Sequence, residues 1–286
     1  MNYNNFTSIS IGDIEGIGIE IILKLWKKNK IKNFIVFTNI DIFNNYLKKN
    51  KIKISINLIN HTLFSEKQEL KNKFNIFSFK ASNKIENVIY SLKYSYTYTK
   101  QFQLKGLLTL PLNKDKIIIN KNKNFTGHTE YLEKIDKVKI SNMIFIKNNI
   151  IFSTVTTHIK LKNVATKLNN KAFLFNKIKC LYKSLNKDFN IKNPKVIVSG
   201  LNPHAGENGK LGDEEINIIE PIINKLKKLD FKIHGPVSGD SMISRKKLKK
   251  YDCFLFMYHD QALIPFKFIS QNSGINYTSN LSIIRV

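Results

Sequence analysis

Three of the six histidines in this 286-residue chain follow apolar, strand-like runs. His158 ends Thr-Val-Thr-Thr-His, His204 lies in Gly-Leu-Asn-Pro-His-Ala-Gly-Glu, and His259 lies in Met-Tyr-His-Asp-Gln-Ala. Segments that follow the strands of an α/β sheet assemble sites at one edge of that sheet. Neutral imidazole is a common ligand for divalent transition metals. The pattern therefore predicts a three-histidine metal site with an open position for a substrate.

The elements that must position these histidines alternate between strand and helix. Strands are expected at 9–11, 34–38, 52–59, 106–110, 144–147, 150–155, 196–199, 231–233 and 253–257. Helices are expected up to about residue 30 and at 42–49, 85–100, 164–185 and 214–229, while 60–85 is polar and hard to place. This alternation predicts an α/β fold with a largely parallel sheet. Asn148-Asn149 predicts a hairpin, and hence a second subregion.

The chain is strongly basic, with 47 Lys and Arg against 21 Asp and Glu, a net charge of +26. Such a charge favours nucleic acid or an anionic membrane as a partner. Only Arg245 and Arg285 are arginine, however, whereas nucleic-acid sites usually recruit arginine for forked contacts. The lysines are also spread along the whole length among Asn and Ile. Solvated lysine faces are therefore the favoured interpretation, with no nucleic-acid partner.

The cysteine and hydropathy patterns are those of a protein from a reducing compartment. Cys180 and Cys253 show neither metal-ligand nor redox spacing and are expected to be buried thiols. No apolar stretch is long enough to span a bilayer, and no signal peptide is evident. A cytoplasmic location without a membrane partner is expected.

Seven segments, in order, resemble the 4-hydroxythreonine-4-phosphate dehydrogenase family. They are Gly12-Asp13 to Glu20, Leu110-Pro111-Leu112-Asn113-Lys114, Gly127-His128-Thr129-Glu130-Tyr131-Leu132, Thr156-Thr157-His158, Gly200 to Glu207, Gly235-Pro236 to Asp240-Ser241, and Tyr258 to Lys267. The resemblance runs from the first strand to the last residue. It implies the isocitrate/isopropylmalate dehydrogenase-like fold, with two α/β lobes and a cleft between them. The first lobe would span 1–126, rejoined by 273–286, and the second 127–272.

The resemblance also implies the metal site and the reaction. In that family the motif histidines bind a divalent cation at a dimer interface, so His158, His204 and His259 would hold Zn²⁺, Mg²⁺ or Co²⁺ in a homodimer. The reaction would be NAD-dependent oxidation of 4-phosphooxy-L-threonine with decarboxylation to 3-amino-2-oxopropyl phosphate, in vitamin B6 synthesis. A hydroxyl bound to a cation becomes more acidic, which favours departure of hydride from its carbon.

The substrate-binding residues implied by the family are His128, Thr129, Lys267, Asn276 and Arg285. A phosphorylated, zwitterionic substrate needs cations, and arginine offers a fork for phosphate or carboxylate. An alternative interpretation of the 127–130 segment is a helix start, with Thr129 as the cap and Glu130 favouring the helix dipole. The alternative for Arg285 is that it has no role in binding and is present by chance as one of the two arginines in the chain.

Two further loops match the family. Gly12, Asp13, Gly16 and Gly18 lie in a glycine-rich loop between a strand and a helix, which resembles the superfamily loop near the nicotinamide of NAD. It is not the spaced Rossmann fingerprint. Asp240 ends a loop that faces the site in the family, so it is a candidate for handling a proton, with a surface turn as the equal alternative.

The chain departs from the family pattern in two ways. It ends at Val286, where the family continues with a segment that helps to bind the adenosine of NAD. It also carries Ile14, Ile19 and Ala262 where the family has Pro, Pro and Gly. Two alternatives therefore stay open: a dehydrogenase of another phosphorylated sugar acid, such as threonate or erythronate phosphate, and a degenerate homologue that acts as a scaffold or basic binding protein.

Overall fold

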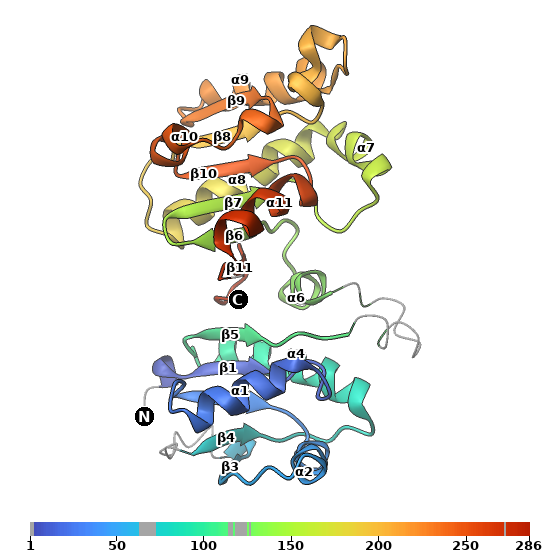
Figure 1. Ribbon diagram of the computed structural model, residues 1–286, viewed down its shortest axis with the longest axis vertical. Helices are drawn as coiled ribbons and strands as arrows, with labels where there is room; N and C mark the ends of the chain where they lie inside the picture. Colours follow the sequence, from blue (N-terminus) through green and yellow to red (C-terminus); the bar gives the residue numbers. More distant parts are fainter. Residues whose placement is uncertain (1–2, 63–72, 114–116, 118–124, 126, 272) are drawn as a thin grey trace. The chain divides into compact units, whose positions relative to one another are not determined.

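The computed structural model describes residues 3–62, 73–113, 117, 125, 127–271 and 273–286, which form two compact units (Figure 1). The first unit contains residues 1–138 and 281–286, and the second contains 139–280. These divisions differ from the sequence-based ones at 126/127 and 272/273. Residues 128–136 lie with the first unit because Leu132 packs into its core, and 275–278 lie with the second because they pair with its sheet.

The first unit is built on a parallel five-stranded sheet of order β3-β4-β2-β1-β5. Its strands are β1 (Thr7–Ser10), β2 (Phe34–Phe37), β3 (Ile56–Ile59), β4 (Phe74–Phe77) and β5 (Gly106–Thr109). Its helices are α1 (Ile17–Lys27), α2 (Ile40–Lys49), α4 (Lys84–Gln101) and α6 (His128–Asp136), after a short 3₁₀ turn at Tyr3–Asn5.

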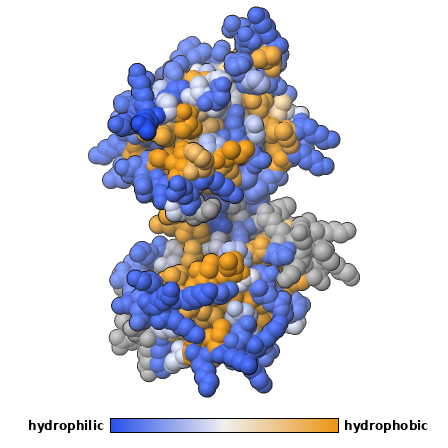
Figure 2. All heavy atoms as spheres, viewed as in Figure 1, coloured by the Kyte–Doolittle hydropathy of each residue, from blue (hydrophilic) through white to orange (hydrophobic). Residues whose placement is uncertain are grey.

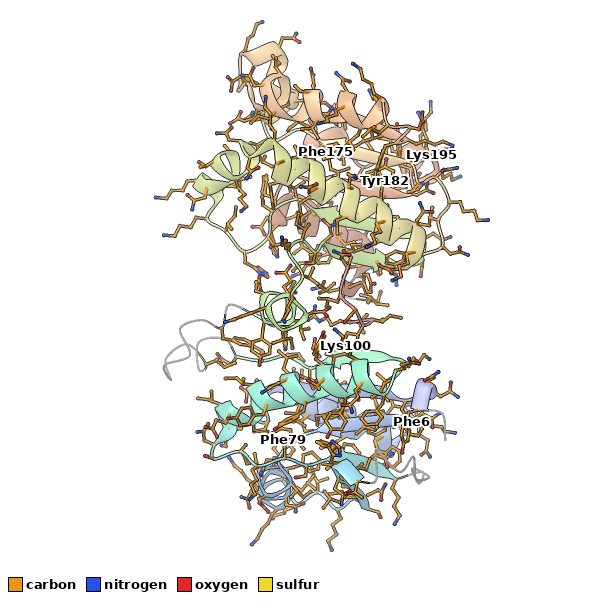
Figure 3. All side chains as sticks on the ribbon, turned by 180° about the vertical axis from the view of Figure 1, so that it is seen from behind. Phe6, Phe79, Lys100, Phe175, Tyr182 and Lys195 are labelled. Atoms are coloured by element: carbon orange, nitrogen blue, oxygen red, sulfur yellow. The ribbon has the colours of Figure 1, made fainter. Side chains whose placement is uncertain are left out.

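Helices cover both faces of this sheet because its strands are apolar on both faces. One face packs against α1 and α2, through residues such as Ile22 and Phe43, and forms one core cluster with Ile9 and Val36. The other face packs against α4, whose Tyr98 contacts Phe37 and Phe77. Figure 3 shows α4 across this second face, where Phe79 packs against Tyr90 and Tyr94 of the helix.

The second unit is built on a six-stranded sheet of order β11-β6-β7-β10-β8-β9. Its strands are β6 (Met143–Lys147), β7 (Ile150–Thr154), β8 (Val196–Ser199), β9 (Ile233–Val237), β10 (Cys253–Phe256) and β11 (Ile275–Thr278). Four adjacent strands, β7, β10, β8 and β9, are parallel, whereas β6 and β11 pair antiparallel.

The helices of the second unit are α7 (Val164–Leu168), α8 (Lys171–Lys187), α9 (Glu220–Lys227), α10 (Arg245–Lys250) and α11 (His259–Ser270). Phe266 of α11 packs on Phe145 and Phe152 of the sheet, with ring centroids 5.6 Å apart in both pairs. Helix α8 lies across the opposite face, where Phe175 and Tyr182 are labelled in Figure 3. Tyr182 meets Phe231 edge-on, with centroids 4.6 Å apart.

Several sequence-based expectations are confirmed, among them the 144–155 hairpin and the strand at 196–199. Others are wrong. The helix expected at 164–185 is broken because the Asn170 side chain caps a new helix at the backbone N–H of Phe173. The run at 253–257 is not the last strand, since α11 and β11 follow it. Strand β4, within the unplaced 60–85 segment, is fully buried.

Both cysteines are buried and free, as expected from the sequence. Within the described residues, no helix combines the length and apolar character needed to cross a membrane.

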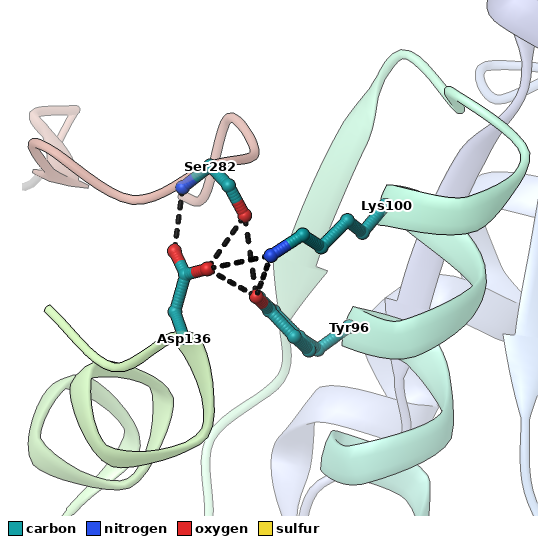
Figure 4. A network of polar contacts seen from close by, with 4 residues as sticks. All are labelled: Tyr96, Lys100, Asp136 and Ser282. Carbon is teal, nitrogen blue, oxygen red and sulfur yellow. Dashed lines mark hydrogen bonds and ion pairs between the residues drawn. The ribbon is translucent and has the colours of Figure 1, made fainter.

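A buried carboxylate fastens the last residues of the chain to the first unit (Figure 4). Asp136, at the end of α6, accepts hydrogen bonds from the Ser282 backbone N–H at 2.5 Å and the Ser282 hydroxyl at 2.7 Å. It also accepts from the Tyr96 hydroxyl and from Lys100 Nζ, the latter at 3.1 Å. Its side chain is only 2% exposed, while that of Lys100 is 53% exposed. One residue thus joins α4, α6 and the 281–286 segment.

The pKa of Asp136 follows from these contacts. Burial alone would raise the pKa of the carboxyl, but the hydrogen bonds from Ser282, Tyr96 and Lys100 outweigh it and hold the pKa below its usual value. A carboxyl with a depressed folded-state pKa stabilises the fold above its unfolded-state pKa, near 4, and loses this contribution as the pH falls through the folded-state value.

Asp136→Asn is therefore expected to lower the free energy of unfolding at pH 7 by about 1 to 3 kcal/mol, because an amide group would face hydrogen-bond donors in a buried place. The difference from the unsubstituted protein should shrink as the pH falls below about 4. Urea unfolding at several pH values measures it. Asp230→Asn, at an exposed turn with positive φ that Asn tolerates, is the matched control. Equal effects of the two substitutions would contradict the anchoring role.

Candidate functional site

The three motif histidines lie at one edge of the second sheet. Because β7, β10, β8 and β9 are adjacent and parallel, the segments after them leave the sheet on the same side. His158 follows β7, His259 follows β10 and His204 follows β8, while Asp240 follows β9. The sequence-based expectation that these residues gather at one sheet edge is met by the topology.

His158 and His259 are brought side by side. Their ring centroids are 5.5 Å apart, with 47° between the ring planes. The two segments are joined by Thr156, whose hydroxyl donates to the Met257 carbonyl at 2.8 Å. A cavity of about 240 Å³ opens here, lined by Thr156, Thr157, His158, Ile159, Leu161, Val164, Tyr258, His259 and Asp260.

A carboxylate orients one of these imidazoles. His259 Nδ1 lies 2.6 Å from Asp260 Oδ1 and is hydrogen-bonded to it. Metal-ligating histidines usually donate their second ring N–H to a carboxylate in this way, which leaves the other nitrogen for the metal. The donor set thus fits a cation bound through His259 Nε2. Asp260 was not singled out from the sequence, although a carboxylate directly after a candidate ligand is the signal that could have found it.

The third histidine does not complete a ligand set within one chain. Its segment follows β8, and β10 separates β8 from β7, so His204 lies beyond the neighbouring pair. Among the described residues, no group of three or more His, Cys, Asp and Glu side chains is arranged to hold a metal ion. Two of the three predicted ligands are therefore adjacent, and the third lies further along the same edge, exposed to solvent.

His204 begins an unusual backbone turn. Residues 204–209 all have positive φ, from 43° at Glu207 to 90° at Gly209. A left-handed conformation costs a residue other than glycine roughly 1–2 kcal/mol, so it rarely persists over consecutive positions. The surrounding contacts must therefore hold this turn, which lies within the 3₁₀-like segment Pro203–Gly209.

Asp240 lies close to His204 but is exposed. It belongs to the short turn Gly239–Ser241, and the Ser238 hydroxyl donates to its Oδ1 at 2.6 Å. This hydrogen bond, and to a lesser degree the Ser241 backbone N–H, hold the pKa of the Asp240 carboxyl below its usual value. An ionised carboxylate in this place can accept a proton or orient a neighbouring group.

Lys267 and Asn276 are both exposed, on α11 and β11. Eight residues separate Lys267 from His259 on the same helix, which corresponds to roughly 12 Å along the axis. Asn276 lies on the edge strand, opposite Phe145. The structure of one chain therefore does not bring these two predicted substrate residues to the histidine pair.

The first unit gathers the other predicted substrate residues. Arg285 is 6% exposed, and its guanidinium donates to the Thr109 hydroxyl at 2.8 Å. Burial lowers the pKa of Arg285 to about 10, with Glu130 acting in the opposite direction. Glu130 follows His128 and Thr129 in the first turn of α6. The alternative of a helix start is confirmed, since α6 begins at His128 with Glu130 in its first turn, but the cap is Gly127 and not Thr129.

The glycine-rich loop follows β1 and packs on the chain after β5. Gly12 has φ +62°, and a Cβ there would lie 2.3 Å from the Pro111 carbonyl oxygen. A Cβ on Gly18 would lie 2.9 Å from the Leu110 Cβ. Asp13 closes the turn by accepting the Glu15 backbone N–H at 3.0 Å and the Gly16 backbone N–H at 2.9 Å. Packing thus accounts for two of these glycines without a cofactor.

Two other features concern this region. Lys114 of the 110–114 motif lies outside the described residues. A cavity of about 350 Å³ adjoins the glycine-rich loop, lined by Ile14, Glu15, Ile42, Asn45, Tyr46, Lys49, Asn50 and Lys84.

Residues 30–286 match the model of the family described as pyridoxal phosphate biosynthetic protein PdxA. The chain belongs to the PdxA family. It is 34% identical over 295 residues to a 4-hydroxythreonine-4-phosphate dehydrogenase of Wigglesworthia glossinidia brevipalpis, covering 100% of this chain and 88% of that protein. It is 30% identical over 297 residues to the enzyme of that name from Bacteroides thetaiotaomicron, covering 97% and 79%.

Solved structures of PdxA proteins share the fold. A 4-hydroxythreonine-4-phosphate dehydrogenase from Klebsiella pneumoniae superimposes with a TM-score of 0.85 at 24% identity, covering 98% of this chain and 89% of that one. The corresponding Salmonella typhimurium protein gives 0.82 at 23% identity, with 98% and 89% covered. The α/β fold and the family inferred from the sequence are therefore confirmed.

Gly12→Ala is expected to destabilise the first unit of this PdxA protein. A left-handed residue other than glycine costs about 1 to 3 kcal/mol, and the added Cβ would also overlap the Pro111 carbonyl. Thermal unfolding without any cofactor measures the effect. Gly16→Ala is the comparison, because Gly16 has φ −89°, which alanine adopts, so this variant adds only a close contact of 3.1 Å with the Asp13 carbonyl oxygen. A Gly12→Ala protein as stable as the Gly16→Ala protein would refute the packing explanation.

Proposed function

We propose that this chain is an NAD-dependent, divalent-metal-dependent 4-hydroxythreonine-4-phosphate dehydrogenase. It would oxidise the C3 hydroxyl of 4-phosphooxy-L-threonine and release 3-amino-2-oxopropyl phosphate after decarboxylation, a step of vitamin B6 synthesis. Membership of the PdxA family and the names of its relatives support the reaction. The observation that carries the chemistry is the oriented pair His158 and His259 beside a cavity.

Each part of the chain has a separate task in this proposal. When bound, NAD would supply the hydride acceptor, and a divalent cation would supply Lewis acidity toward the substrate hydroxyl and toward the negative charge left by loss of CO₂. His158, His204 and His259 would hold the cation, and the hydrogen bond with Asp260 would orient His259. Arg285, with His128 and Thr129, binds the phosphate or carboxylate, together with Lys267 and Asn276. Asp240 is the candidate to accept a proton, because it follows β9 and so lies at the same sheet edge as the histidines.

A homodimer completes the site in this proposal. One chain brings only two of the three histidines together, so a second chain is needed to supply the remaining ligand. The surface around the pair is suited to a partner: Ile264 and Phe268 of α11 are 70% and 86% exposed, and Leu161 is 67% exposed. Figure 2 shows apolar side chains gathered on the face of the second unit that carries α11. We also propose a cytoplasmic location, on the basis of membership of the same family.

The direct test is an assay of the purified protein with Zn²⁺, Mg²⁺ or Co²⁺, NAD⁺ and 4-phosphooxy-L-threonine. NADH formation is expected, followed by absorbance, with release of CO₂ in equal amount. Threonate and erythronate phosphates, tested in parallel, should be poorer substrates. Higher activity on one of these would transfer the assignment to that sugar acid. No NADH from any substrate, with metal and dimer both confirmed, would favour the degenerate homologue.

Substitution of a ligand tests the metal site independently of activity. His259→Ala is expected to lower the affinity for Zn²⁺ by more than about a hundredfold, since loss of a group that merely orients a ligand already costs 10- to 100-fold. Competition with a chelator measures the affinity. His234→Ala is the control, because His234 is exposed and stacks on Tyr251 with centroids 5.8 Å apart. Equal affinities of the two variants would rule out His259 as a ligand.

A further inference from the structure

The carboxylate of Glu215 lies buried beneath the turn that carries His204. Glu215 is 1% exposed and begins the π-helical turn Glu215–Ile219 that leads into α9. Its Oε1 accepts the backbone N–H groups of Leu201 at 2.6 Å and Asn202 at 2.9 Å. Its Oε2 accepts from Asn202 Nδ2 at 2.9 Å. All three donors belong to the segment that enters the His204 turn.

The same carboxylate touches both glycines that flank the histidine. A Cβ on Gly200 would lie 2.8 Å from Glu215 Oε1, and a Cβ on Gly206 would lie 2.7 Å from Oε2. The chain therefore passes over the carboxylate on each side of His204, with no room for a side chain. This close approach accounts for glycine at two positions of the Gly200-to-Glu207 motif.

The contacts explain how a left-handed turn persists. Six consecutive residues with positive φ, 204–209, are unfavourable without support, and hydrogen bonds to a charged acceptor are stronger than those between neutral groups. Glu215 supplies such bonds at the entry to the turn. Gln261 ties the same entry to the His259 segment: its Nε2 donates to the Gly200 carbonyl at 2.9 Å, and its Oε1 accepts the Met257 N–H at 2.8 Å.

We propose that Glu215 is a positioning residue that holds His204 in the conformation required of a metal ligand. It acts through the backbone of residues 200–206 and does not itself touch the cation. This inference rests on the proposed function, because it assumes that His204 ligates. Asp260 orients the imidazole ring of His259 through a direct hydrogen bond. Glu215 would instead orient the backbone turn that carries His204.

A double-mutant cycle tests the proposal. Zn²⁺ affinity is measured by chelator competition on the full-length protein and on Glu215→Gln, His204→Ala and the double variant. Glu215→Gln is expected to weaken Zn²⁺ binding about 10- to 100-fold, because its amide NH₂ would face a donor. In the His204→Ala background, Glu215→Gln should leave the Zn²⁺ affinity almost unchanged, because Glu215 cannot act through His204 once the imidazole is absent. Equal losses in both backgrounds would overturn the proposal.

Controls separate this proposal from the proposed function. Glu220→Gln, an exposed glutamate at the start of α9, should leave Zn²⁺ affinity unchanged. If His204→Ala binds Zn²⁺ as tightly as the unsubstituted protein, His204 is not a ligand and the metal site itself fails. If His204→Ala weakens binding but Glu215→Gln does not, only the positioning role is overturned.

A milder variant keeps the test decisive if Glu215→Gln does not fold. Asn202→Ala removes the hydrogen bonds from Asn202 Nδ2 to Glu215 Oε2 and to Glu214 Oε2, but leaves the buried Glu215 carboxylate and its two backbone donors. It is expected to weaken Zn²⁺ binding several-fold, and only when His204 is present. An unchanged affinity, with the fold verified by circular dichroism, would overturn the proposal.

Discussion

The parallel pairing of β7, β10, β8 and β9 is the constraint on which the candidate metal site depends. Parallel strands end on one side of their sheet, so the segments that leave them share that edge. His158, His259, His204 and Asp240 lie far apart in sequence, and only this pairing gathers them. The order of strands also sets their neighbours: His158 and His259 follow adjacent strands and touch, whereas His204 follows the next strand along.

Buried carboxylates hold the irregular segments around this regular framework. Asp136 fastens the last residues of the chain to α4 and α6, and thereby keeps Arg285 beside β5. Glu215 supports the left-handed turn at His204. In both cases several donors converge on one buried carboxylate, so hydrogen bonds offset the cost of burying its charge, and Lys100 is an additional counter-ion for Asp136. Loop geometry in this protein therefore depends on polar groups inside the fold.

Much of the fold was predictable because its apolar periodicity is strong, as in the buried run Val196–Ser199 and the hairpin around Asn148. Strand β4 was missed because buried Asn75 interrupts its pattern; only tertiary contacts with Asn57 and the Phe34 carbonyl satisfy that side chain. Helix α11 was missed because Pro265 lies inside it and Ile264 and Phe268 face solvent, so no single apolar face marks it.

The sequence by itself determined the family and the three histidine motifs, because short segments of defined chemistry survive in order along the chain. The tertiary structure decided how these residues are grouped. It paired His158 with His259, set His204 apart on a left-handed turn, and buried Arg285 against Thr109. It also showed that Gly12 and Gly18 are needed for packing. The distance between two side chains depends on strand order and on backbone contacts between segments that are remote in sequence. Local residue spacing determines neither of these.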